Sequence, residues 1–182
     1  LRSEKSGIPT WRSCQAKTRM KWSKHVRETE GWLYAVQTLR NAITANTFLA
    51  TTVLSLLTVI SGKLWGLIRS FDALSGRKRL MLQFGSISLC MLISAYEFLQ
   101  SARLMTHAGF MFPVVKGDKV DEIMRKSQIS QWLGLRWLYI SLGFILWAVA
   151  GEWGFLCATL GLVKFFKQID KVPAGLDEKD LI

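Results

Sequence analysis

The stretch that decides the fold is NAITANTFLATTVLSLLTVISG, which runs from Asn41 to Gly62 without a charged residue. At about 1.5 Å of rise per residue, a helix of this length crosses the roughly 30 Å hydrocarbon core of a bilayer. We therefore expect a membrane-spanning helix here. Hydrocarbon, not water, is then the medium around much of the chain.

Three further apolar stretches follow, over residues 80–102, 133–151 and 153–169. The last two are joined by the sequence AGEWG at residues 150–154, which predicts a tight helical hairpin. As a helix the fourth stretch is only about 25 Å long, which is short for a full crossing. Four spans are the leading prediction, and three spans with a re-entrant helix are the alternative.

The composition bounds the domain organisation. The 182 residues are 50% hydrophobic and include eight Trp and ten Phe, which indicates a single membrane domain. We assign this domain to residues 32–169, with a basic N-terminal extension at 1–31 and a charged C-terminal tail at 170–182. The basic residues are not interleaved with exposed aromatics as in a nucleic-acid-binding module, so no nucleic-acid partner is expected.

The distribution of positive charge predicts the orientation. The chain carries 24 Lys and Arg against 13 Asp and Glu, for a net charge of +11. With four spans, nineteen of the basic residues fall on the side of both termini and five on the other. Because basic loops stay on the side that does not cross during insertion, both termini should face the cytosol, matrix or stroma.

The predicted fold class is an all-α integral membrane four-helix bundle with short interfacial helices. The first connection, residues 63–79, spaces its apolar residues almost helically among charges and predicts an interfacial helix. The second connection, residues 107–131, contains Pro113 and a charged stretch. It predicts a turn followed by a short solvent-facing helix.

One polar stripe follows the first span. Its members are Gln37, Asn41, Thr44, Thr51 and Ser55, at steps of three and four residues or their sum. A polar stripe in lipid favours contact with another helix, so packing inside the bundle is preferred to a path for solutes. Asn46 lies off this stripe and is expected to face a second neighbour.

A second stripe follows the next span, at steps of four and three residues. Its members are Ser86, Cys90, Ser94, Glu97 and Ser101. Small side chains let two membrane helices approach closely, and Gly134, Ser141 and Ala148 form a comparable seam on the third span.

Charges within or beside the spans are the remaining candidates. Glu97 is the carboxylate most deeply placed in an apolar stretch, and Arg40, Arg103 and Arg136 lie on the same predicted side. A structural ion pair is the favoured interpretation, because an unpaired charge in hydrocarbon is unfavourable. Basic residues near span ends are candidates for lipid headgroups: Arg77, Lys78, Arg79, Lys164 and Lys167.

No reaction is predicted. The motifs of phosphate-binding loops, dinucleotide sites, hydrolases and zinc proteases are missing from the sequence. Cys14, Cys90 and Cys157 are isolated, and the only histidines, His25 and His107, have no clustered partners at metal-ligand spacing. We expect a protein that is not an enzyme and has no metal or cofactor, with a structural phospholipid such as cardiolipin as an optional ligand.

Three blocks resemble a known family. They are AVQTLRNAITANTFLATT (35–52), FLQSARLMTHAGF (98–110) and GLRWLYISLGFILWAVAG (134–151). In order and spacing they resemble small four-span membrane proteins of plants and bacteria grouped only as a domain of unknown function. The resemblance covers about residues 32–166. It implies a four-helix membrane fold and supplies no activity.

The leading functional hypothesis is a non-catalytic accessory subunit of an energy-transducing membrane complex, of respiratory-chain or ATP-synthase type. It places the chain in the mitochondrial inner membrane with matrix-facing termini, or else in a chloroplast membrane, among other membrane subunits and anionic lipids. The alternative is a small oligomeric transporter or channel with Glu97, Arg40 and Arg136 on a polar path. A lipid-handling enzyme is the weakest candidate, since no nucleophile and base can be placed.

Overall fold

The computed structural model describes residues 10–70, 74–115 and 118–171, and every regular element in these ranges is an α-helix. The helices are α1 (Trp11–Glu28), α2 (Trp32–Ser70), α3 (Leu74–Met111) and α4 (Lys119–Ile169). The all-α fold class is confirmed. Helices α2, α3 and α4 are each long and apolar enough to cross a membrane.

The helix ends follow local sequence signals. Thr10 caps α1, because its side chain accepts from the Ser13 backbone while the Ser13 side chain accepts from the Thr10 backbone. Pro113 lies two residues beyond the end of α3, where it stops the helix from continuing. Asp121 and Glu122 occupy the first turn of α4, where acidic side chains are favourable.

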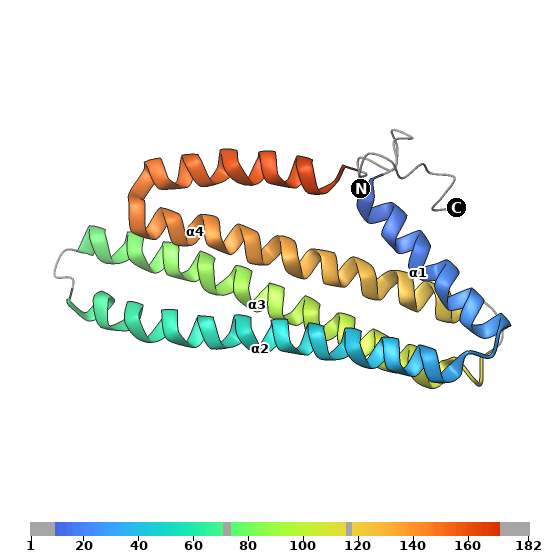
Figure 1. Cartoon of the computed structure of the whole chain (residues 1–182). Helices are drawn as coiled ribbons and strands as arrows, with labels where there is room; N and C mark the ends of the chain where they lie inside the picture. Colours follow the sequence, from blue (N-terminus) through green and yellow to red (C-terminus); the bar gives the residue numbers. More distant parts are fainter. Residues whose placement is uncertain (1–9, 71–73, 116–117, 172–182) are drawn as a thin grey trace.

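Helix α3 is the central helix of the molecule. It packs along α2 on one side and along α4 on the other, while α2 has only a few contacts with α1. Figure 1 shows the three long helices as a row. They do not form a ring, since α4 folds back onto itself and leaves α2 with one extensive neighbour.

The bend in α4 occurs at Gly151. This residue has φ 67° and ψ −153°, a conformation that essentially only glycine adopts. The first arm of α4 ends there, and the second arm, residues 152–169, runs back along it (Figure 1). Gly154 permits the tight approach, because a Cβ there would stand 2.6 Å from the Leu146 carbonyl oxygen. The hairpin predicted at residues 150–154 is confirmed in position.

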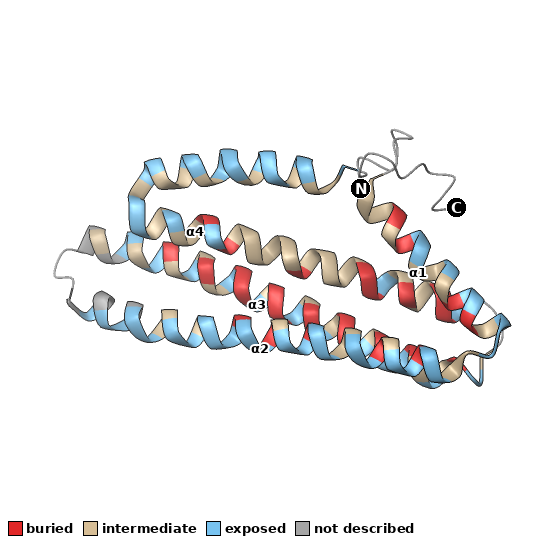
Figure 2. Cartoon of the chain, viewed as in Figure 1, coloured by how far each residue is buried: buried red, intermediate tan, exposed pale blue. Residues whose placement is uncertain are grey.

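Two separate cores hold the helices together. The central core joins α2 to α3 and the first arm of α4, and its buried residues are Ala50, Val53, Ile87, Met91, Ala95 and Phe98. The terminal core draws on all four helices, and its buried residues are Val26, Ala35, Leu39, Met105, Ala108, Phe112, Val120 and Met124. Figure 2 shows burial following α3 and concentrating where α1 joins the other helices.

Helix α1 completes the terminal core. Its backbone N–H at Trp11 donates to the Asp170 carbonyl at 3.1 Å, so α1 begins where the second arm of α4 ends. Figure 1 shows the two segments following one another along the same side of the first arm. The described part of the predicted N-terminal extension is therefore built into the folded body.

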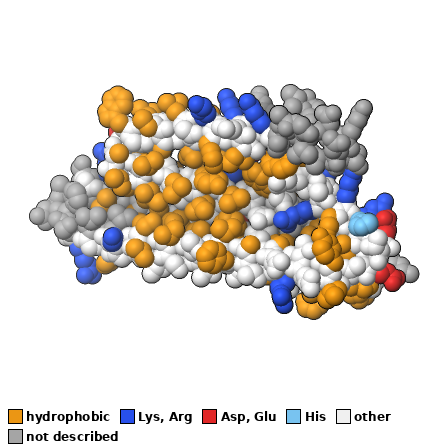
Figure 3. Space-filling view, in the orientation of Figure 1, with side chains coloured by type: hydrophobic (Ala, Val, Ile, Leu, Met, Phe, Trp, Pro, Cys, Tyr) orange, Lys and Arg blue, Asp and Glu red, His pale blue; other side chains and the backbone are white. Residues whose placement is uncertain are grey.

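The surface supports a membrane location. Large apolar side chains are exposed on all three long helices, among them Val59, Leu82 and Leu160. Figure 3 shows them covering the middle of the visible face, with Lys and Arg mostly toward its margins. A surface of this kind in contact with water would be unusual for a monomer, and it is compatible with an integral membrane protein.

The two connections match the sequence-based expectation only in part: the turn predicted at Pro113 is present at residues 112–114, but the two predicted short helices are not separate elements. Residues 63–70 continue α2 without a break, and residues 119–131 are the beginning of α4. Neither stretch is a separate short helix, because the helical hydrogen bonding of the neighbouring span simply extends through it. Residues 71–73, at the centre of the predicted interfacial helix, lie outside the described residues.

Candidate functional site

The polar stripe on α2 faces away from the rest of the protein. We define the outward face of α2 as Gln37, Asn41, Thr44, Thr51 and Ser55, all of which are exposed. The Thr51 hydroxyl donates to the Thr47 carbonyl in its own helix at 2.8 Å. The other four side chains form no hydrogen bond with any residue that the structure describes.

The inward face of α2 is built from other residues. Ala35, Leu39, Ala50 and Val53 pack against the neighbouring helices, and Asn46 lies among them with no exposed surface. The Asn46 amide donates to the Ala42 carbonyl at 2.8 Å. Packing of the polar stripe inside the bundle was therefore the wrong expectation, since apolar burial on the opposite side of α2 decides which face turns inward.

The stripe on α3 lies in the contact with α4. The hydroxyls of Ser94 and Ser101 are buried and donate to the backbone carbonyls of Gly134 and Ser127, at 2.7 and 2.8 Å. Cys90 is also buried, and Ser86 donates to the Leu82 carbonyl of its own helix. A Cβ at Gly134 would come within 3.0 Å of the Phe98 ring, which explains the small residue there.

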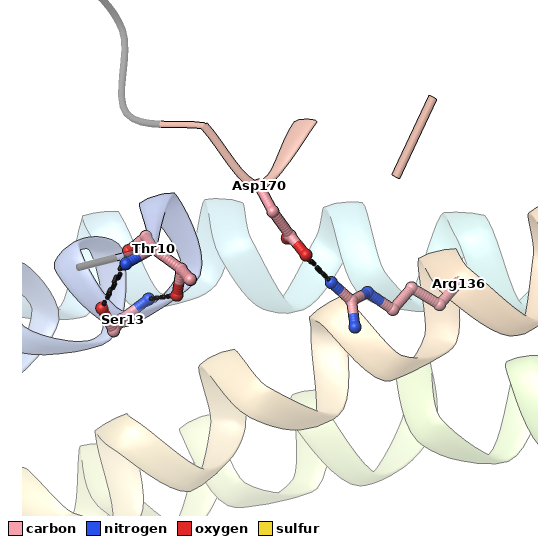
Figure 4. A network of polar contacts seen from close by, with 4 residues as sticks. All are labelled: Thr10, Ser13, Arg136 and Asp170. Carbon is pink, nitrogen blue, oxygen red and sulfur yellow. Dashed lines mark hydrogen bonds and ion pairs between the residues drawn. The ribbon is translucent and has the colours of Figure 1, made fainter. Parts of the chain in front are cut away.

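The charges predicted to line a polar path form no ion pairs with one another among the described residues. Arg136 forms an ion pair with Asp170 at 2.5 Å and lies over the Phe166 ring, as the close-up in Figure 4 shows for the pair. No ion pair joins Glu97 to Arg40, Arg103 or Arg136 within the described residues. The expected pair is therefore not formed, and Arg136 is paired instead with Asp170 at the end of the second arm.

The basic candidates for lipid headgroups lie at both ends of the apolar region. Arg79 forms an ion pair with Glu152 at 2.7 Å, which ties the start of α3 to the bend of α4. Lys78, Lys164 and Lys167 are exposed. The side chain of Arg77 lies outside the described residues.

A polar network that the sequence did not predict joins α1 to α4. Asp121 is buried and accepts from the Ser23 hydroxyl and the Arg27 guanidinium, both at 2.5 Å. The spacing of Trp11, Gln15, Arg19, Trp22 and Val26 along one face of α1 is the signal that could have revealed it. Because this segment mixes many basic residues with aromatic ones, its composition predicts a basic extension, although its spacing is that of an amphipathic helix.

An open polar cavity adjoins this network. It lies between α1 and α4 and has a volume of about 490 Å³. Its lining residues are Gln15, Arg19, Gln128, Gln131, Trp132 and Leu135. Burial lowers the pKa of the Arg19 guanidinium from its ordinary value, yet arginine remains charged at neutral pH. The cavity therefore combines a fixed positive charge with side-chain amides.

The described residues offer no metal centre. No group of three or more His, Cys, Asp or Glu among them could hold a metal ion. Cys14 and Cys90 are buried free thiols, and Cys157 is exposed.

Comparison with known protein families gives a match over most of the chain. Residues 1–173 fit a family described as "protein of unknown function, DUF599". The chain belongs to this family. The resemblance to a domain of unknown function is thereby confirmed, but the matched region is wider than residues 32–166. It includes the basic N-terminal segment, which lies outside the stretch predicted from the three blocks.

This family assignment agrees with the structure of the N-terminal region, where α1 contributes to the terminal core. No match was found among the curated proteins or among the solved structures.

Proposed function

We propose that this protein is a non-catalytic subunit of a larger membrane assembly and that the outward face of α2 binds a neighbouring subunit. The observation that carries the proposal is the exposure of Gln37, Asn41, Thr44 and Ser55 on a membrane-length helix. Such side chains in hydrocarbon gain from interhelical hydrogen bonds of about 0.6 to 2 kcal/mol each.

The partner that fits this face is a transmembrane helix of another subunit with hydroxyl or amide side chains of its own. The amides of Gln37 and Asn41 each supply a donor and an acceptor, and the hydroxyls of Thr44 and Ser55 add two shorter groups further along. A partner helix can therefore lie along α2 with polar contacts over about five helical turns. The exposed apolar residues between them, such as Phe48, would pack around those contacts.

We further propose that this assembly is an energy-transducing complex of respiratory-chain or ATP-synthase type in the mitochondrial inner membrane, with both termini of this chain in the matrix. The excess of basic residues on the side of the termini supports this orientation. The hydrogen bond between Trp11 and Asp170 supports a common side for the two ends.

Native electrophoresis in mild detergent, with mass spectrometry of the band that contains this chain, tests the proposal. We expect companions at fixed stoichiometry. A triple variant, Gln37→Leu, Asn41→Leu and Thr44→Val, should run as the free protein at the same expression level, because these exposed side chains form no hydrogen bond with any residue that the structure describes. Thr159→Val is the matched control, since this exposed hydroxyl bonds only to its own helix.

Three results would contradict the proposal. Migration of the wild-type chain as a lone monomer would contradict membership of an assembly. Retention of the triple variant in the complex would show that the outward face of α2 is not the contact. A band holding only further copies of this chain would replace the foreign subunit with self-association.

A further inference from the structure

The cavity between α1 and α4 contains an arginine with no acidic partner. Arg19 donates to the Gln131 side-chain oxygen at 3.0 Å and contacts the Met105 sulfur at 3.8 Å, and both partners are neutral. No carboxylate is paired with it in the described ranges. A half-buried cation without a counter-ion is unfavourable, so an anion that entered the cavity would be bound strongly.

The amides around Arg19 are arranged as donors. The Gln131 side-chain oxygen accepts from Arg19, and the Gln15 side-chain oxygen accepts from the Gln128 amide at 3.3 Å and from the Trp132 indole N–H at 3.0 Å. The NH₂ groups of Gln15 and Gln131 form no hydrogen bond with a described residue, so they can donate to a ligand. A site with one cation and two free amide donors suits the oxygens of a phosphate.

One buried acceptor adds a second requirement. The side-chain oxygen of Gln128 has no hydrogen-bond partner among the residues that the structure describes, and Gln128 is 5% exposed. Its amide NH₂ group already donates to Gln15. A buried acceptor of this kind gains from a hydroxyl donor on the ligand. The ligand should therefore carry a hydroxyl near its phosphate.

The position of the cavity indicates which class of phosphate compound it binds. Its α4 residues, 128–135, directly precede the uncharged stretch 137–151, and Trp132 and Leu135 give it an aromatic and an aliphatic wall. Aromatic residues at such a boundary lie at the depth of lipid headgroups. We infer that this cavity binds the phosphodiester of an anionic lipid whose headgroup carries a hydroxyl, with Arg19 as the principal contact.

The test uses the full chain in detergent and measures lipid affinity by native mass spectrometry. The probes are short-chain phosphatidylglycerol, phosphatidylethanol, which has the same phosphodiester without the hydroxyl, and inorganic phosphate. We expect phosphatidylglycerol to bind about tenfold more tightly than phosphatidylethanol, and Gln128→Leu to abolish that difference. Arg19→Gln should weaken both lipids about tenfold or more, whereas Lys21→Gln, an exposed charge on the same helix, should not.

A variant that is expected to be more stable than the wild type tests whether weaker lipid binding is caused by misfolding. Gln131→Glu places a carboxylate beside Arg19, so it should raise the melting temperature while it weakens lipid binding. Equal lipid affinities of the Arg19→Gln and Lys21→Gln variants would contradict the assignment of this cavity as the lipid site. Binding of inorganic phosphate as tight as that of phosphatidylglycerol, and equally dependent on Arg19, would overturn the lipid assignment in favour of the free ion.

Discussion

Asp121 is the side chain on which the attachment of α1 most depends. Its side chain is 7% exposed, and that of its partner Arg27 is 15% exposed. An ion pair so far removed from water adds little when it is intact, but loss of one member leaves the other charge buried. The Ser23 hydroxyl would also lose its acceptor.

We therefore expect Asp121→Ala to lower the free energy of unfolding by about 3 to 5 kcal/mol. The neighbouring Glu122 is the matched control, because its pair with Arg125 at 2.8 Å lies at the surface. Glu122→Ala should cost less than about 1 kcal/mol. Thermal unfolding in detergent measures both. Equal melting temperatures for the two variants would show that the buried network does not hold α1.

At the residue scale the sequence predicts which side chains share a helix face, but it does not predict which face is covered. The spacing of Gln37, Asn41 and Thr44 correctly groups them on one side of α2. Periodicity says nothing about whether that side turns toward α3 or away from it. The small and apolar residues on the opposite side, such as Ala50, settle the question only once α3 is in place.

At the scale of elements, Gly151 separates the two arms of α4. Its φ of 67° requires glycine, and the returning arm is fastened near its far end by the pair between Arg136 and Asp170. The T-shaped contact of Tyr139 with Phe165, at 5.0 Å between ring centroids, adds to the contact between the arms.

Gly151→Ala should cost about 1 to 3 kcal/mol and loosen the second arm from the first. Gly161→Ala is the control, since Gly161 is helical and a Cβ there meets open space. Spin labels at exposed Leu142 and Leu160 report the distance between the two arms. We expect the distribution of this distance to be broader in Gly151→Ala and unchanged in Gly161→Ala. Identical distributions for the two variants would mean that the bend does not depend on glycine.

The long helices could be predicted because charge-free runs and helical periodicity are properties of contiguous sequence. The hairpin in α4 is visible for the same reason, as a short AGEWG segment between two apolar runs. The spacing of residues along α1 indicates an amphipathic helix, but it does not reveal where that helix packs. Its burial depends on Asp121 and Val120, which lie about a hundred residues away along the chain.

At the scale of the whole molecule, the row of α2, α3 and α4 leaves an uncovered side on α2. The second arm of α4 covers the first arm, and α1 covers the start of α4, so the opposite edge of the row has no cover. Figure 2 shows most of α2 as exposed. If that edge faced lipid alone, its amides would have no partners in hydrocarbon.

Photo-crosslinking in native membranes tests the central claim, that another helix covers the outward face of α2. A photoreactive amino acid at Thr44 should give one discrete protein adduct whose added mass is that of a different subunit. The same group at Leu160, an exposed apolar position on the second arm of α4, should react mainly with lipid. Reaction of the Thr44 probe with lipid alone, as at Leu160, would contradict the account.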